Sequence, residues 1–199
     1  MFHVKHEGWT LEQLSPAQRL SLDAYERLLA EHAVPRGMVS ASDVGQLRER
    51  HILDSLRAFA YLPAEPLGAI DLGSGAGLPG VPVAIARPDL SVTLVEPRQA
   101  RAAFLELVVE RLRLSNATVL ARPVEELALE PAGVTLARGF RGLAETWTIS
   151  RELLLPDGAL IYWAGRTFRS EDIPDDARAV AIGRPALESG GPIVIMTRQ

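Results

Sequence analysis

Apolar residues follow a helical pattern in the first third of the chain. Between about residues 10 and 60, leucines recur at roughly helical spacing with charged residues between them, which predicts an N-terminal helical extension. Pro35 and Gly37 interrupt this pattern, and a second helical stretch is expected from about Ser42, with Ser42 or Asp43 as its N-cap. The leucines of the first stretch are Leu11, Leu14, Leu20, Leu22, Leu28 and Leu29.

The pattern changes to short apolar runs from about Gly68 onward. The first five runs are separated by segments long enough for helices, of which residues 98–114 are the clearest. This alternation predicts an α/β fold in which a parallel sheet carries helices on both faces. The last two runs lie too close together for a crossover helix and should pair as an antiparallel C-terminal hairpin at one edge of a mostly parallel seven-stranded sheet. The runs are Ala69–Leu72, Val92–Val95, Thr118–Leu120, Val134–Ala137, Ala159–Trp163, Ala179–Ile182 and Ile193–Met196.

One turn between an expected strand and an expected helix is rich in glycine. Asp71 lies near the end of the first apolar run, and Gly73, Gly75 and Gly77 follow at alternate positions. Ligands of open parallel sheets bind just beyond the carboxyl ends of the strands. Glycines let the backbone approach a ligand closely and adopt positive φ angles. This turn is therefore the expected binding site.

Two classes of nucleoside cofactor use such a turn. Gly75, Gly77 and Gly80 form a literal G-x-G-x-x-G, the pattern of dinucleotide sites, but Gly73 already ends the strand, so this match starts two residues late. The alternative is an acid followed by G-x-G-x-G. It resembles the first motif of S-adenosylmethionine-dependent methyltransferases, in which a carboxylate such as Asp71 suits a sulfonium cation.

An acid at the end of the second run, Glu96, also fits a nucleoside ligand. A carboxylate at this point can accept hydrogen bonds from both ribose hydroxyls, and both cofactor classes use one there. Chain length helps to choose between them. A dehydrogenase usually carries a second, substrate-binding domain, and 199 residues leave no room for one. We therefore expect S-adenosylmethionine rather than a dinucleotide.

Amino-acid composition limits the expected location and chemistry of the protein. Its 199 residues suffice for one domain, and the absence of cysteine excludes disulfides, thiolate metal sites and cysteine nucleophiles and makes a reducing cytoplasm the expected location. No apolar stretch approaches the roughly 18 residues of a membrane span, so we expect no membrane insertion. The net charge of −4 does not by itself predict a nucleic-acid binder, although a basic face can lie on an acidic body. We also expect no metal site and a monomer.

Three stretches together carry a more specific resemblance. Residues 50–56 read RHILDSL, residues 71–82 read DLGSGAGLPGVP, and residues 137–140 read ARGF. In this order and spacing they resemble the bacterial 16S ribosomal RNA guanine-N7 methyltransferase family, also called glucose-inhibited division protein B. The resemblance implies a single domain over residues 1–199, with a Rossmann-like class I methyltransferase core from about 67 to 199 and extra helices from about 10 to 60. It implies methyl transfer to N7 of a guanine in a decoding-region loop of 16S ribosomal RNA.

The resemblance also assigns roles to residues of this chain. The cofactor pocket would be shaped by the turn that contains Asp71, Glu96 would hold the ribose, and Arg138 would line the pocket. No general base is expected, because N7 of guanine carries a free lone pair and no proton must leave before attack. The remaining implied cofactor contacts are Gly73, Ser74, Gly75, Gly77, Leu78, Val124 and Glu125.

Candidate RNA contacts are basic residues near the same edge of the sheet. They are His51, Arg101, Arg141 and Arg166, and His51 is also a candidate for a structural hydrogen bond between the N-terminal helices and the core. Ala100 and Ala164 stand where the family pattern has lysines, which leaves the exact RNA target open. Two alternatives therefore stand beside the small-subunit RNA enzyme. One is a methyltransferase that acts on another RNA or a small molecule, and the other is a non-catalytic ribosome-binding module.

Overall fold

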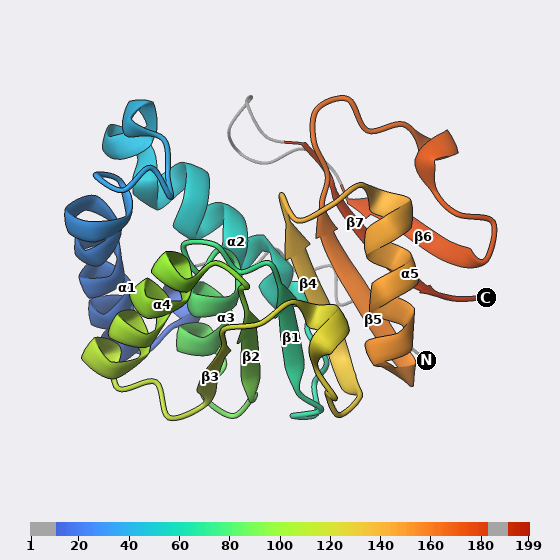
Figure 1. Ribbon diagram of the computed structural model, residues 1–199, viewed down its shortest axis with the longest axis horizontal. Coiled ribbons are helices and arrows are strands. Elements are labelled where there is room, and N and C mark those ends of the chain that lie inside the picture. Colours follow the sequence, from blue (N-terminus) through green and yellow to red (C-terminus); the bar gives the residue numbers. More distant parts are fainter. Residues whose placement is uncertain (1–10, 183–190) are drawn as a thin grey trace.

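A seven-stranded sheet runs through the middle of the protein in the order β3-β2-β1-β4-β5-β7-β6 (Figure 1). The computed structural model describes residues 11–182 and 191–199. Strands β1 to β5 are parallel, whereas β7 runs antiparallel to both β5 and β6. The α/β prediction, with its antiparallel C-terminal hairpin, is confirmed. The strands are β1 (Ala69–Leu72), β2 (Val92–Val95), β3 (Ala117–Leu120), β4 (Ala132–Arg138), β5 (Leu154–Trp163), β6 (Ala177–Ile182) and β7 (Ile193–Arg198).

Both faces of the central strands are buried, and successive residues face different hydrophobic clusters. On β4, Leu136 packs in one cluster and Ala137 in the other, and on β5 the same is true of Leu160 and Ile161. This two-sided burial explains why the strand sequences are almost continuously apolar. It also makes Asp71, in the middle of β1, an exception that requires a specific reason.

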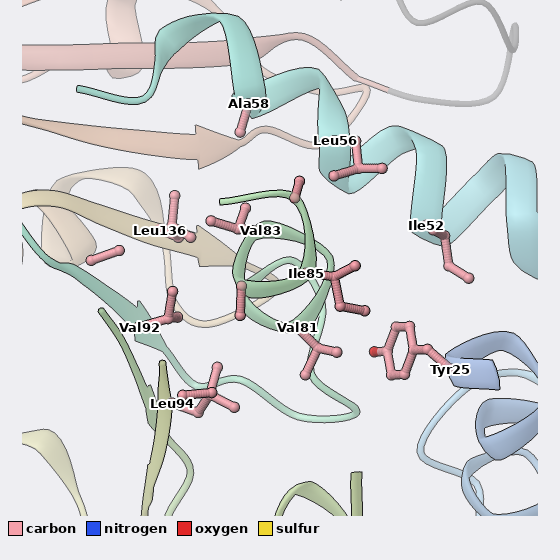
Figure 2. Close-up of a cluster of buried hydrophobic side chains, with 14 of the residues drawn as sticks. Tyr25, Ile52, Leu56, Ala58, Val81, Val83, Ile85, Val92, Leu94 and Leu136 are labelled. Atoms are coloured by element: carbon pink, nitrogen blue, oxygen red, sulfur yellow. The ribbon is translucent and has the colours of Figure 1, made fainter. Parts of the chain in front are cut away.

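Helices cover the two faces unequally. One cluster contains side chains of α1 (Pro16–Leu28), α3 (Gly80–Ala86) and α4 (Gln99–Leu112), and α5 (Leu143–Leu153) contributes to the other. Figure 2 shows the first cluster, where Tyr25 from α1 points toward Val81 and Ile85 of α3. The N-terminal segment and the sheet therefore share one core. Within the described residues, no helix has the length and apolar character needed to cross a membrane.

The N-terminal segment is helical, as expected, but it is broken into short pieces. Ser15 and Gln18 form a capping box at the start of α1, and Gln18 also donates to the last carbonyls of α3. Two details differ from the sequence prediction. Leu20 is 67% exposed, and Ser40, rather than Ser42 or Asp43, caps the second stretch. That stretch comprises η3 (Ala41–Gln46), η4 (Arg48–Leu53), α2 (Asp54–Leu56) and η5 (Arg57–Tyr61), and η2 (Leu29–Ala33) extends α1.

Two further elements differ from the alternating pattern. The segment between β3 and β4, although long enough for a helix, contains only the 3-10 turn η6 (Val124–Glu126). Strand β5 begins at Leu154, five residues before the apolar run that predicted it, and its pairing with β4 shifts register between Ala132 and Val134. The added residues include Pro156, Asp157 and Gly158, a triplet typical of turns that interrupts the apolar pattern.

Candidate functional site

The glycine turn follows β1 at the carboxyl edge of the sheet. Gly73, Gly75 and Gly77 all have positive φ angles, of 67°, 60° and 92°, so each adopts a backbone conformation that side chains disfavour. The amide of Ser74 donates to the carbonyl oxygen of Val95 at 2.9 Å, which ties the turn to the end of β2. The glycine turn therefore lies at the carboxyl edge of the sheet, as the sequence pattern predicted.

Asp71 lies beneath this turn and holds the start of the next helix. Its Oδ2 accepts a 3.1 Å hydrogen bond from the amide of Gly80, the first residue of α3, while Oδ1 is buried with no hydrogen-bond partner among the described residues. A Cβ on Gly80 would lie 2.5 Å from Asp71 Oδ2, so the close approach requires glycine. The carboxyl group thus supports the turn from inside the protein.

Burial changes the acid strength of Asp71. The side chain is fully enclosed, and this desolvation raises its pKa from 3.8 to about 7. The hydrogen bond from the Gly80 amide acts in the opposite direction, and the charge of Glu96 adds to the increase. Asp71 therefore titrates near neutral pH, unlike an exposed carboxylate.

Glu96, just beyond β2, completes the turn from the other side. Its Oε2 accepts from the Gly75 amide and its Oε1 from the Arg98 amide, both at 2.9 Å. A carboxylate offers about four lone-pair positions, so each oxygen can still accept another donor. The two acids predicted from sequence, Asp71 and Glu96, are thus brought to the same turn.

Four amides of the turn are already occupied within the protein. Ser74 donates to Val95, Gly75 to Glu96, and both Gly77 and Leu78 donate to the Ser74 carbonyl. A pyrophosphate would need such amides as donors and would lie against the Glu96 carboxylate. The turn therefore suits a ligand that donates hydrogen bonds to a carboxylate better than it suits a dinucleotide.

Arg101 lies at this turn, in the first part of α4. Its Nη1 is 4.0 Å from Oε2 of Glu96, and a Cβ on Gly75 would lie 3.9 Å from the same nitrogen. Sequence reasoning assigned Arg101 to the RNA. The structure places it beside the carboxylate expected to hold the ribose.

Tyr25 is a part of the site that sequence reasoning missed. Its hydroxyl donates a 2.7 Å hydrogen bond to the carbonyl oxygen of Ala76, and a Cβ on Gly77 would lie 3.0 Å from the same hydroxyl oxygen. Burial raises the pKa of Tyr25 well above its usual value, so the hydroxyl remains a donor. A tyrosine in a helical pattern carries no sequence signal for a contact with a turn 51 residues away.

Phe140 approaches the turn from the loop after β4. A Cβ on Gly73 would meet Cδ2 of the Phe140 ring at 2.6 Å, so this ring packs directly on the first glycine. The guanidinium of Arg141 lies 4.8 Å from the centre of the same ring and pairs with Glu125 of η6 and with Glu145. Arg141 is therefore engaged by two carboxylates, and Val124, next to Glu125, is buried in the core.

Arg138 and His51 meet at the boundary between β4 and the N-terminal segment. Nη2 of Arg138 lies 3.2 Å from Nδ1 of His51 and donates to the carbonyl oxygen of Arg50 at 3.0 Å. Nη1 of Arg138 lies 3.5 Å from Oδ2 of Asp54. His51 is thus enclosed, and it makes the structural hydrogen bond that its sequence motif suggested.

A cavity of about 610 Å³ opens between the start of α5 and the segment after β5. Tyr162 and Phe168 contribute aromatic surface to it, and Glu145 and Asp172 contribute carboxyl groups. Arg166 is exposed in the same segment and makes no ion pair with any residue in the ranges 11–182 and 191–199. In those ranges there is also no group of three or more histidine, cysteine or acidic residues that could hold a metal ion.

Solved structures that resemble this chain share its fold. The magnesium protoporphyrin IX methyltransferase ChlM from Synechocystis PCC 6803, solved with bound S-adenosylmethionine, matches 94% of this chain and 99% of its own length with a TM-score of 0.66 at 12% identity. The putative methyltransferase yhhF from Escherichia coli matches 74% of this chain and 84% of its own length with a TM-score of 0.55 at 17% identity. These matches show a class I methyltransferase fold.

Relatives by sequence are more specific. The Acidiphilium cryptum protein named ribosomal RNA small subunit methyltransferase G is 38% identical over 73% of this chain and 67% of its own length. The Corynebacterium diphtheriae protein of that name is 38% identical over 85% of this chain and 78% of its own length, and the Streptomyces coelicolor protein is 40% identical over 74% and 62%. A family model described as GidB, rRNA small subunit methyltransferase G, matches residues 18–182. With most of its length matched by that model, the chain belongs to the GidB family.

Proposed function

We propose that this protein transfers a methyl group from S-adenosylmethionine to N7 of a guanine in a decoding-region loop of 16S ribosomal RNA. The observation that carries the proposal is the pairing of Glu96 with the Gly75 amide at 2.9 Å, in a turn where the amides of Ser74, Gly77 and Leu78 also donate to protein carbonyl groups. Relatives of this family are named for methylation of small-subunit ribosomal RNA. We therefore take the family's reaction as the reaction of this chain.

The residues present fit the cofactor. Glu96 keeps lone pairs for two ribose hydroxyls, and the space next to Gly75 contains no atom closer than 3.8 Å to an added Cβ. Glycine at this position leaves room for a ligand against the backbone. When bound, S-adenosylmethionine supplies a methyl group that its sulfonium makes electrophilic.

The reaction requires little acid–base chemistry from side chains. The N7 lone pair forms the new N–C bond, the C–S bond breaks, and the sulfur keeps that electron pair while the positive charge passes to the purine. No proton is transferred, so we assign no general base. What the protein contributes is alignment of N7, the methyl carbon and the sulfur along one line.

The cavity between α5 and the segment after β5 is our proposed site for the unstacked guanine. Tyr162 and Phe168 offer aromatic surface for stacking, and Asp172 or Glu145 can accept from the N1–H and N2–H₂ edge. Carboxylates near the base also suit a purine that becomes cationic. The cavity opens at the carboxyl end of β5, the same edge of the sheet as the glycine turn.

Mass spectrometry of ribosomal RNA from cells with and without the gene tests this proposal. We expect one guanine of the small-subunit RNA to lose a methyl group in the deletion strain, and chain cleavage after borohydride and aniline treatment to identify N7 as the methylated atom. Purified protein should restore the mark on deletion-strain subunits when S-adenosylmethionine is added. Loss of a methyl group at another RNA identifies a different substrate, and no binding of S-adenosylmethionine identifies a non-catalytic module.

A further inference from the structure

His51 connects two charged side chains from distant parts of the chain. Its Nε2 lies 3.0 Å from Oδ2 of Asp43, and its Nδ1 lies 3.2 Å from Nη2 of Arg138. The side chains of His51 and Asp43 are only 14% and 12% exposed. Both ring nitrogens of the imidazole are therefore committed to protein partners.

The identity of these partners fixes the proton on the ring. A guanidinium has five N–H donors and no acceptor, so Nδ1 of His51 must offer its lone pair to Arg138. A neutral imidazole carries its single proton on the other nitrogen. That proton, on Nε2, is donated to the carboxylate of Asp43. Only this tautomer satisfies both contacts.

The N-terminal segment makes further contacts with the Arg138 guanidinium. Nη2 also donates to the carbonyl oxygen of Arg50 at 3.0 Å, and Nη1 donates to the His51 carbonyl oxygen at 3.4 Å. Oδ2 of Asp54 lies 3.5 Å from Nη1. The orientation of this arginine, which stands at the end of β4, is therefore set by the N-terminal segment.

We propose that His51, held in its Nε2–H tautomer by Asp43, is a positioning residue that orients the Arg138 guanidinium for S-adenosylmethionine, and that protonation of the imidazole releases this guanidinium. The inference rests on the proposed function and on the family resemblance, which implies that Arg138 lines the cofactor pocket. Ala137, the residue before Arg138, pairs with Leu72 at the end of β1, directly before the glycine turn. Protonation would place an N–H group on Nδ1, facing the N–H groups of Arg138 at 3.2 Å. The hydrogen bond would become a repulsion between two cations.

The surroundings of His51 keep it neutral at pH 7. Burial is the main cause that lowers its pKa from 6.5, followed by the charge of Arg138, and Arg50 acts in the same direction. The hydrogen bond to Asp43 and the charge of Asp43 act against them. Beyond Arg138, the charged or titratable neighbours are Asp54 of α2 and Tyr25 of α1. We therefore expect release only in acid, below pH 6.5.

Two amide variants separate the two contacts of the ring. In His51→Asn the amide lies where Nδ1 was, so its oxygen can accept from Arg138, and it does not titrate. In His51→Gln the amide lies where Nε2 was, so it reaches Asp43 but leaves Arg138 without its acceptor. A purely structural role gives no reason for Asn to be better than Gln.

Calorimetric titration with S-adenosylmethionine at about pH 5.5 and 7.5 measures the effect. At the higher pH we expect His51→Gln to bind about tenfold more weakly than wild type and His51→Asn to stay within about twofold. Acidification should weaken binding by the wild type more than binding by His51→Asn. Asp71 titrates in the same range in every variant, so the difference between wild type and His51→Asn isolates His51. His32→Asn, elsewhere in the N-terminal segment, should keep the wild-type pH profile.

Three results would decide against the proposal. One is a His51→Gln variant that binds as tightly as wild type, and another is a His51→Asn variant with the wild-type pH profile. The third is a ligand-free NMR spectrum in which Nδ1 of His51, rather than Nε2, carries the proton. If the wild type binds no S-adenosylmethionine at either pH, the proposed function is overturned, and with it the role of His51. The NMR spectrum then still shows whether the tautomer of His51 is as described.

Discussion

The hydroxyl of Tyr25 on α1 donates a 2.7 Å hydrogen bond to the carbonyl oxygen of Ala76 in the glycine turn. This bond joins the N-terminal segment directly to the turn that we propose as the cofactor site. The added helices therefore do more than cover one face of the sheet. They hold the backbone on which the ligand is proposed to rest.

Removing this hydroxyl should destabilise the protein. Tyr25→Phe deletes a fully buried hydrogen bond, so the free energy of unfolding in urea should fall by about 1–3 kcal/mol. Tyr162→Phe is the matched control, because its hydroxyl donates to the Arg141 carbonyl oxygen at 2.9 Å from a half-buried position, and its loss should cost less. Equal losses of unfolding free energy in the two variants would show that the Tyr25 hydrogen bond contributes no more to stability than that of Tyr162.

The space next to Gly75 can be tested with a second glycine of similar backbone geometry. Gly75 and Gly37 have φ angles of 60° and 66°, and a Cβ on Gly37 would meet no atom within 4 Å. Each alanine substitution should therefore cost about 1 kcal/mol of stability through backbone strain. Only Gly75→Ala should weaken S-adenosylmethionine binding, by about tenfold or more, because its methyl group enters the ligand space. Calorimetry that finds equal affinities would place the ligand elsewhere.

Asp71 should make stability depend on pH in an unusual direction. Its pKa is raised from 3.8 to about 7 in the folded protein, so the folded state binds the proton more tightly than the unfolded state. The contribution of Asp71 to stability is therefore full below pH 3.8 and is lost as pH rises toward 7.

Asp71→Asn supplies the comparison, because the amide can still accept from the Gly80 amide and does not titrate. Relative to this variant, the wild type should lose about 1.4 kcal/mol per pH unit between about pH 4 and 7 and then level off. Urea unfolding of both proteins at several pH values measures the difference. A difference that does not change with pH would show that Asp71 is ionised throughout that range.

Arg101 and Arg166 should affect different ligands. Arg166 is exposed without an ion pair among the described residues, so Arg166→Ala should lower the salt slope of RNA binding by about 0.7 and leave cofactor affinity unchanged.

Arg101 lies 4.0 Å from Glu96 and competes with ribose hydroxyls for that carboxylate. Arg101→Ala should therefore raise cofactor affinity about twofold with little effect on the salt slope. If Arg101→Ala lowered the salt slope of RNA binding and Arg166→Ala did not, Arg101 would instead be assigned to the surface that binds RNA.

The parts of the fold that depend on local patterns were predictable. Both β1 and β2 have the bounds of the apolar runs that predicted them, because a buried parallel strand is apolar on both faces. The start of β5 was not predictable, since the Pro-Asp-Gly triplet at 156–158 joins the strand at the register shift between Ala132 and Val134. The segment between β3 and β4 is long enough for a helix, but length alone does not determine whether one forms there.

The candidate site divides in the same way. Asp71 and Glu96 were recognisable because strand ends and glycine turns have local signatures. Tyr25 and Phe140 were not, because each contributes through a contact between segments distant in sequence. The position of the Arg101 guanidinium next to Glu96 depends on the direction of one long side chain, which sequence spacing does not determine.

The position of β7 between β5 and β6 has a consequence for the order in which the protein folds. Within the described residues, β6 is hydrogen-bonded only to β7, whose other neighbour is β5. A hairpin forms in about 1–10 μs, whereas pairing β5 with β7 must first close a loop on the order of 30 residues. We therefore expect β6 and β7 to associate first and dock onto β5 as one unit. On this route β6, the outer strand, joins the sheet already paired with β7, the strand that follows it in the chain.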